Sequence, residues 1–398
     1  MGVGRYRRIL AVPDVRLLLA TTVVGRLPIG INALALVLFL RERTGSFAVA
    51  GAVAGAVALG TGLGAPVAGR WIDRRGERVL LPLAVGHGLG LLALLGLGAL
   101  RAPAGALVGC GVATGIALPP LAAVLRAQWP ALLASAPELL GSAYALEAVL
   151  IEVIFVGGPL LTGALVALVD PAAALVVSAV AVVGGTAAFL AVLPARARVT
   201  PAAPGAPKPP WAGALAAPGI QTLVLAMAPV GFAFGAVEVA LPAFADAQGA
   251  RPWAGVLIAV WSCGSAVGGL VYGVLPRRVP LARMHLWIAG ILPLGFLPLA
   301  LPGSVWLMAL LVIPAGVCIA PLIASRNELA GAVAPAGAET EAYTWPLTAL
   351  ISGIALGAAV AGALADGPGW QAPMLAAAGA AAIGGIVTVL RRGTLPAS

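Results

Sequence analysis

Long apolar stretches, separated by short polar or glycine- and proline-rich connections, run along the whole chain. Each stretch covers about twenty or more residues, which is enough for a helix that rises ~1.5 Å per residue to cross a ~30 Å hydrocarbon core. Transmembrane barrel strands would instead alternate apolar and polar residues over about ten positions. The pattern therefore predicts twelve membrane-spanning helices. They lie near residues 16–40, 47–70, 79–100, 104–128, 138–169, 172–193, 217–245, 252–275, 281–301, 304–330, 338–364 and 370–390.

The composition fits a protein whose solvent is the lipid bilayer. Hydrophobic residues make up 61% of the 398 residues and charged residues only 9%, whereas a soluble domain carries about a quarter charged residues. Unpaired backbone groups in the hydrocarbon core are costly, so the spanning segments must be helices or closed barrels. The sequence thus predicts an all-α membrane protein. The net charge of +9 does not indicate a nucleic-acid partner, because the basic residues lie between the apolar stretches.

The basic residues also predict the orientation of the helices. If the N-terminus is cytoplasmic, most of them fall on the cytoplasmic side, where positive charge accumulates in membrane proteins. These residues are Arg5, Arg7, Arg8, Arg16, Arg70, Arg74, Arg75, Arg78, Arg126, Arg196, Arg198, Lys208, Arg277, Arg278, Arg283, Arg326, Arg391 and Arg392. The opposite side keeps Arg41, Arg43, Arg101 and Arg251. Both termini are therefore expected in the cytoplasm.

The choice of residues indicates a bacterial source. Lys208 is the only lysine among 23 basic residues, and alanine and glycine are abundant, a bias typical of GC-rich bacterial genomes. No small-residue cleavage site follows the first apolar run, so this run is expected to remain as a helix. We therefore expect a multi-pass protein of the bacterial inner (cytoplasmic) membrane.

Residues 194–214 differ from the apolar stretches around them. Five prolines between positions 200 and 210 remove backbone donors and fix φ, so this stretch cannot be helical. We interpret it as a cytoplasmic linker between an N-terminal six-helix bundle, residues 1–193, and a C-terminal six-helix bundle, residues 215–398. Two equal bundles joined in this way are typical of a duplicated transporter with a substrate path between its halves near the bilayer midplane.

The clearest motif lies after the second helix, where positions 69–78 read Gly-Arg-Trp-Ile-Asp-Arg-Arg-Gly-Glu-Arg. Gly69 permits helices to approach closely and Gly76 permits a tight turn. Asp73 can lie near the positive N-terminal end of another helix. The alternative interpretation is an ordinary charged loop. The basic residues that flank the aspartate within the motif include Arg74 and Arg78.

This motif resembles the loop signature of the major facilitator superfamily, with Glu77 in place of one basic residue. Gly158 and Pro159 in the fifth helix resemble part of the Gly-Pro signature of that family's antiporters. The arginine-bearing motif of the family's fourth helix is not found, since this helix carries no charge before Arg126, at its expected end. The resemblance implies two pseudo-symmetric six-helix bundles, a transporter of the drug or metabolite efflux type, and a gating role for the loop.

A charge in the hydrocarbon core costs free energy, so each charged residue within a predicted helix is expected to have a partner or a function. Arg26 and Glu147 both lie about 14 Å from the cytoplasmic side, so we expect them to form a buried pair. Glu152 lies further in, where a carboxylate could bind and release a proton. Glu238 lies beside Pro242, which predicts a helix break at a cavity, and could bind a proton or a substrate cation. For each carboxylate, the alternative is a fixed ion pair that only holds two helices together.

Charges near helix ends have simpler interpretations. Glu339 and Glu341 begin the eleventh helix, where negative charge suits the positive end of the helix dipole. Arg326 and Glu328 lie near the end of the tenth helix and are expected at the membrane interface.

The residues exclude several classes of function and leave two directions of transport open. No zinc-protease motif, histidine pair or P-loop occurs, and the three cysteines have no metal-ligand spacing, so we expect no enzyme, metal, cofactor or direct ATP coupling. The first hypothesis is a proton-coupled exporter of small apolar or cationic molecules that acts as a monomer. The alternatives are an uptake permease for a neutral or cationic nutrient and, more distantly, a polytopic membrane enzyme. Anionic substrates are disfavoured, because only Arg26 is clearly expected to be buried.

Overall fold

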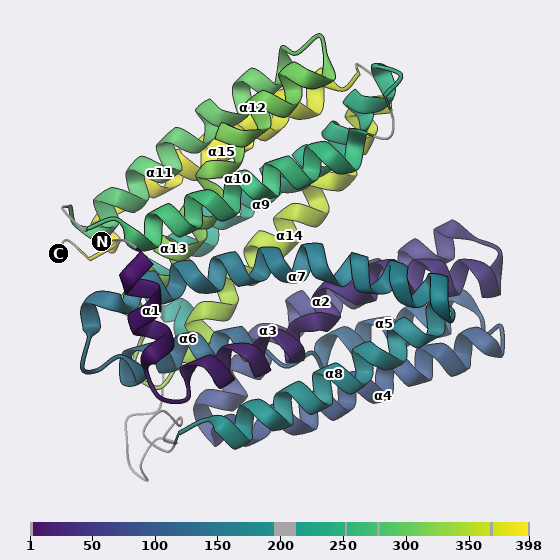
Figure 1. Cartoon of the computed structure of the whole chain (residues 1–398), viewed down its shortest axis with the longest axis horizontal. Coiled ribbons are helices and arrows are strands. Elements are labelled where there is room, and N and C mark those ends of the chain that lie inside the picture. Colours follow the sequence, from purple (N-terminus) through teal and green to yellow (C-terminus); the bar gives the residue numbers. More distant parts are fainter. Residues whose placement is uncertain (1–2, 195–211, 251–252, 277–278, 367–368, 397–398) are drawn as a thin grey trace.

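The computed structural model describes residues 3–194, 212–250, 253–276, 279–366 and 369–396, and in these residues the chain consists of helices and their connections (Figure 1). The α-helices are α1 (Val3–Ala11), α2 (Val15–Thr44), α3 (Phe47–Arg75), α4 (Leu80–Ala99), α5 (Ala104–Ile116), α6 (Leu121–Leu132), α7 (Leu140–Leu168), α8 (Pro171–Val192), α9 (Pro218–Ala247), α10 (Trp253–Val274), α11 (Leu281–Phe296), α12 (Val305–Val317), α13 (Ile319–Val333), α14 (Glu339–Asp366) and α15 (Gln371–Leu390). Most of the predicted linker lies outside the described residues. So do Arg196, Arg198, Lys208, Arg251, Arg277 and Arg278.

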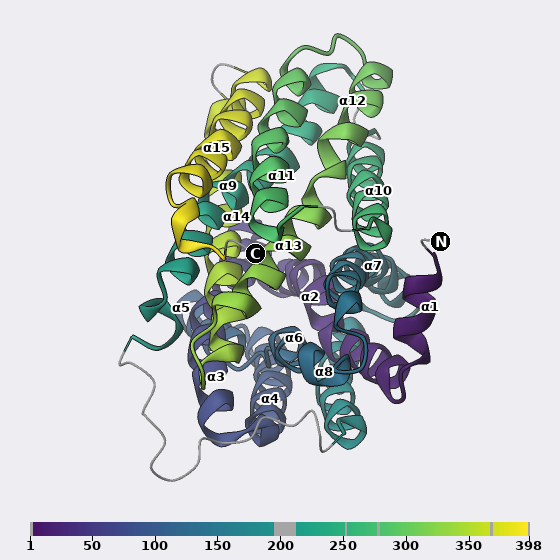
Figure 2. The same cartoon turned by 90° about the vertical axis from the view of Figure 1, so that its left-hand side faces the viewer.

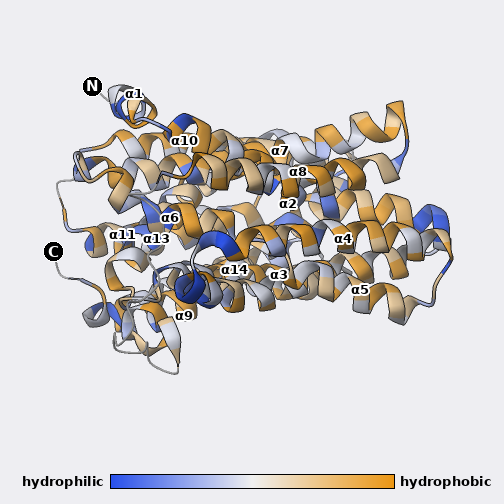
Figure 3. Ribbon diagram, turned by 90° about the horizontal axis from the view of Figure 1, so that it is seen from below, coloured by the Kyte–Doolittle hydropathy of each residue, from blue (hydrophilic) through white to orange (hydrophobic). Residues whose placement is uncertain are grey.

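The prediction of twelve spans is confirmed. Within the described residues, 12 helical segments are long and apolar enough to cross a membrane. Figure 3 shows that hydrophobic residues, in orange, run along the lengths of the helices, and many large hydrophobic side chains are exposed. The chain is therefore an all-α, multi-pass membrane protein.

Two of the twelve spans contain a break. The fourth span, Ala104–Leu132, consists of α5 and α6, which are separated at Pro119 and Pro120. The tenth span, Val305–Val333, consists of α12 and α13, and Pro321 cannot donate a backbone hydrogen bond across their junction. The fourth span ends at Leu132, a few residues beyond its predicted end near residue 128. Because α6 continues to Leu132, Arg126 lies inside the span.

Prolines lie inside two other helices without interrupting them. The helix α9 is continuous from Pro218 to Ala247 with Pro242 inside it. The predicted helix break beside Pro242 is therefore wrong. The helix α7 likewise continues through Pro159 to Leu168.

The helices form two groups that meet at one end. We call α1–α8 the first half, α9–α15 the second half, and the end at which α8 stops and α9 starts the linker end. One cluster of buried apolar side chains belongs to each half, and a third draws on both halves at the linker end. In Figure 1 the halves meet at the left and diverge toward the right, and Figure 2 shows the linker end face-on, with α1 and the end of α15 both lying there.

Candidate functional site

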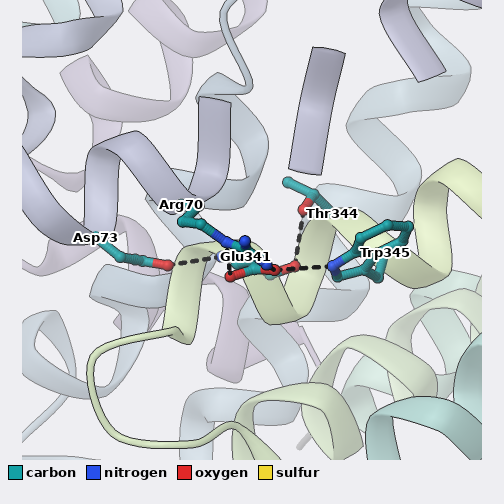
Figure 4. A network of polar contacts seen from close by, with 5 residues as sticks. All are labelled: Arg70, Asp73, Glu341, Thr344 and Trp345. Atoms are coloured by element: carbon teal, nitrogen blue, oxygen red, sulfur yellow. Dashed lines mark hydrogen bonds and ion pairs between the residues drawn. The ribbon is translucent and has the colours of Figure 1, made fainter. Parts of the chain in front are cut away.

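Asp73, in the last turn of α3, binds the first turn of α14 across the two halves (Figure 4). Its carboxylate oxygens accept hydrogen bonds from the backbone N–H groups of Thr340 and Glu341, each at 2.9 Å. The first N–H groups of a helix have no partner within the helix and form its positive end, so a carboxylate suits this position. Asp73 is also buried. It therefore caps a helix of the other half at the linker end.

Arg70, one turn before Asp73, adds an ion pair at the same place. Its Nη2 and Nε atoms donate to Oε1 and Oε2 of Glu341 at 2.7 and 3.1 Å, so the two groups meet at two points. The indole N–H of Trp345 also donates to Glu341 Oε1, at 2.9 Å. Such two-point pairs are stronger than hydrogen bonds between neutral groups. We call Arg70, Asp73 and Glu341 the clasp; the sequence pointed to Asp73 but not to its two companions.

The other members of the predicted gating loop have simpler positions. A Cβ atom on Gly69 would lie 3.0 Å from the Cα atom of Glu341, so the glycine lets α3 approach α14 closely. Gly76 ends α3 with a φ of 77°, which glycine adopts without strain, and its N–H donates to the carbonyl of Ile72. Arg74 and Arg78 are exposed. The glycines of the loop thus permit a close approach of α3 to α14 and a tight turn, and Asp73 contributes hydrogen bonds to α14.

A tyrosine pair forms a second link between the halves. The hydroxyl groups of Tyr144 in α7 and Tyr343 in α14 lie 2.8 Å apart, and both side chains are buried. The Tyr144 hydroxyl also lies 3.4 Å from the carbonyl oxygen of Arg126. Arg70 and Asp73 belong to α3, whereas Tyr144 belongs to α7. The tyrosine pair therefore holds a second helix of the first half against α14 at the linker end.

Glu147 is buried, as expected, but its partner is not the predicted one. Its Oε2 atom lies 2.9 Å from Nε of Arg126, and its Oε1 atom accepts a hydrogen bond of 2.6 Å from the indole of Trp129. The predicted Arg26–Glu147 pair is therefore wrong, although Arg26 lies within electrostatic range of Glu147. The reason is the extension of the fourth span, which places two residues of α6 against α7.

Arg326, which we expected at the membrane interface, is buried inside the protein. Its side chain is 1% exposed, and its Nε atom donates to the amide oxygen of the neighbouring Asn327 at 3.1 Å. The helix α13 continues to Val333, so this arginine lies about two turns inside its end. Together with Arg26 and Arg126, it brings three arginines into the buried region between the halves. The polar pair Arg326-Asn327 within an apolar run was the sequence signal for this burial.

Two of the predicted carboxylates come near each other from different halves. Glu152 of α7 is half-buried and accepts a hydrogen bond of 2.9 Å from the hydroxyl of Ser265 in α10. Glu238 of α9 is exposed and lies within electrostatic range of Glu152. Glu147 does not join them, because it belongs to the arginine cluster. The structure therefore separates the predicted carboxylates into an acidic pair and one member of an ion-paired cluster.

The comparison with protein families now identifies the fold. The family model of the Major Facilitator Superfamily matches residues 18–303, which is more than half of the chain. The chain belongs to the major facilitator superfamily. It is accordingly a membrane transporter for small molecules, as the loop motif implied. Among curated protein sequences, none matches this chain.

Solved structures of other superfamily-type transporters share the fold. A bacterial homologue of the iron transporter ferroportin, in an outward-facing state, has a TM-score of 0.77 and 17% identity, covering 95% of this chain and 99% of that chain. A second structure of a bacterial ferroportin homologue, outward-facing and with soaked iron, gives a TM-score of 0.74 and 18% identity, with 95% of this chain and 98% of that chain covered. The human organic anion transporter MFSD10 gives 0.69 and 16%, with 94% and 99% covered. At these identities the likeness shows the fold alone.

The antiporter-like pair of the superfamily, Gly158 and Pro159, lies in α7 of the first half. A Cβ atom on Gly158 would come within 2.5 Å of a backbone carbon of Gly30, so α7 and α2 cross here with their backbones in close contact. Pro159 is exposed. In this structure Gly158 serves packing between α2 and α7 of the first half.

In the described part of the chain, no group of three or more histidine, cysteine, aspartate or glutamate side chains is placed to hold a metal ion.

Proposed function

We propose that this member of the superfamily is a proton-coupled exporter of small molecules that works by alternating access. The observation that carries the proposal is the acidic pair, Glu152 and Glu238, contributed by different halves of a bundle whose linker end is held by the clasp. Because most of the arginines flank the linker end, we assign that end to the cytoplasm. Because the clasp holds the linker end closed, we assign this structure to an outward-facing conformation.

Protonation of Glu152 and Glu238 supplies the coupling in this proposal. Two charged carboxylates repel each other and are costly to bury, whereas two neutral carboxyl groups are not. Protons taken up from outside therefore let the halves close around the acidic pair. The clasp then has to break before the cytoplasmic end can open. Protons leave there and a substrate enters, so that the substrate moves outward in exchange.

Two sets of charged groups, the acidic pair and the buried arginines, bear on the charge of the substrate. Taken alone, Glu152 and Glu238 would favour a cation, which could replace the protons there. The sequence argument against anions no longer holds, because Arg126 and Arg326 are buried as well as Arg26. The neighbouring structures do not decide the question, since their names refer to iron in one case and to organic anions in the other.

Proton movement in proteoliposomes tests the proposal. The purified protein is reconstituted with the pH-sensitive dye pyranine inside, and ethidium or 1-naphthalenesulfonate is added outside. An exchanger moves protons out as the substrate enters, so the lumen becomes more alkaline. Acidification of the lumen would instead support the uptake permease. Substrate accumulation without any proton movement, relative to protein-free liposomes, would refute proton coupling.

A further inference from the structure

Three arginines from three helices meet between the two halves. Arg26 of α2, Arg126 of α6 and Arg326 of α13 are each no more than 6% exposed. Arg126 is close enough to repel both of the other guanidinium groups electrostatically. Buried like charges of this kind require compensating negative charge, because an unpaired charge in a membrane-spanning segment costs free energy.

The described residues supply less negative charge than this cluster needs. Glu147 is fully buried, but it is already bound to Arg126 and to the indole of Trp129. Arg26 Nε and Arg326 Nη1 have no hydrogen-bond partner in the part of the chain that the structure describes. The nearby polar groups of Arg326 are Asn327, which is neutral, and His285, which brings no negative charge.

One further carboxylate, Glu328, lies close to the cluster without balancing it. It is half-buried and acts electrostatically on the hydroxyl groups of Tyr144 and Tyr343. Counting it together with Glu147 gives two negative charges against the three arginines. The balance remains positive, and each of the three arginines keeps at least one buried donor atom without a hydrogen-bond partner in the described residues: Arg26 Nε, Arg126 Nη1 and Arg326 Nη1.

We propose that Arg26, Arg126 and Arg326 bind the anionic group of the transported substrate, a carboxylate, sulfonate or phosphate carried on an apolar body. This inference rests on the proposed transport function and names its substrate class. Guanidinium groups offer planar, paired donors that match the oxygens of such anions. An apolar body suits the surroundings, because the helices around the cluster carry mainly aliphatic side chains.

The position of the cluster fits a site that is loaded from the linker end. Tyr144 precedes Glu147 by three residues in α7, so the hydrogen bond between Tyr144 and Tyr343 lies about one turn nearer to the linker end. The same hydroxyl of Tyr144 lies near the carbonyl of Arg126. Separating the tyrosines and the clasp uncovers the arginines to the cytoplasm, which is where an exporter must collect its substrate.

Thermal unfolding of the purified full chain in detergent tests the site directly. The probes are 1-naphthalenesulfonate and inorganic phosphate as anions, 2-naphthalenemethanol as a neutral analogue and tetraphenylphosphonium as a cation, all at constant ionic strength. We expect both anions to raise the midpoint temperature in a saturable way. Arg26→Met and Arg326→Met should each need about tenfold more anion for the same shift, since each removes a charge-assisted contact. Arg283→Met, an exposed arginine of α11, is the matched control and should respond like the wild type.

Two further measurements distinguish a loss of anion binding from a loss of folding stability. Without a ligand, Arg326→Met should be no less stable than the wild type, because methionine removes a buried charge that has no carboxylate contact. Arg326→Lys keeps the charge but loses the paired donors and should retain part of the response. The inference is overturned if neither anion stabilises the wild type, or if the methionine variants respond fully. If anions bind but no protons move in proteoliposomes, proton coupling fails while the anion site stands.

Discussion

Arg70 and Glu341 lie 271 positions apart and form a two-point ion pair that joins the halves at the linker end, with N–O distances of 2.7 and 3.1 Å. The same glutamate offers its backbone N–H to Asp73. A single residue at the start of α14 is therefore held by both a charged side chain and a helix-capping carboxylate of α3. Opening this end requires all of these contacts to break together.

Replacing Glu341 by glutamine should loosen the linker end without unfolding the protein. The change removes the ion pair but keeps the backbone N–H that Asp73 binds. Because Arg70 is partly exposed, we expect a loss of about 1 kcal/mol and about fivefold faster hydrogen–deuterium exchange in the first turn of α14. Glu339→Gln, two residues earlier and exposed, is the control. Equal exchange in both variants would contradict a closing role for the pair.

The acidic pair should be required for proton movement. Glu152→Gln and Glu238→Gln keep the size of the side chain but cannot bind and release a proton, so each should reduce substrate-driven pH changes in proteoliposomes at least about tenfold. Both variants should insert and purify normally. Glu42→Gln, at an exposed glutamate of α2, should behave as the wild type. Normal coupling in both acidic-pair variants would rule out this assignment.

The sequence predicted the spans well and the partners of the charges poorly, for physical reasons. Hydropathy over about twenty residues determines which segments cross a membrane. The gating loop could be recognised because its residues are adjacent in the chain. The burial of Arg126 depended instead on where Pro119 and Pro120 divide the fourth span, and hence on how far α6 extends. No local pattern contains that information.

Contacts between helices could not be predicted from the sequence for a related reason. Whether Glu147 meets Arg26 or Arg126 depends on how α2, α6 and α7 lie against one another, and equal depth in the membrane was not enough to choose. Glu341 looked like a residue that merely suits a helix N-terminus, because its partner Arg70 lies in the other half. Both cases require the three-dimensional arrangement of the spans.

The tyrosine pair should show strong energetic coupling. Tyr144→Phe or Tyr343→Phe removes one hydroxyl and leaves the other with a weaker set of partners, so each should destabilise the protein by about 1 kcal/mol. The double variant should lose about the same amount, because one shared hydrogen bond accounts for most of each single effect. Chemical unfolding in detergent micelles measures all four proteins of the cycle. Strictly additive effects would show that the two hydroxyl groups act independently.

The short helix α1 links the first half to the second on the outside of the linker end. The hydroxyl of Tyr6 donates to the carbonyl of Leu270 in α10 at 3.0 Å, and Arg5 donates to the carbonyl of Leu275 at 3.1 Å. Arg8 forms an ion pair of 2.6 Å with Glu138 of its own half. These donors attach α1 to the end of α10, and the carbonyl of Leu275, which directly follows the helix, is one that has no partner within it.

Tyr6 gives this link a predictable dependence on pH. Burial raises the pKa of Tyr6 from 10.0 to about 12. The docked helix therefore holds the phenolic proton more firmly than the free helix does, so its contribution is complete below pH ~10 and is lost as the pH rises through ~12. The tyrosinate absorbance of the wild type, minus that of Tyr6→Phe, should show a single midpoint near pH 12. A midpoint near pH 10 would mean that α1 is not docked on α10 in solution.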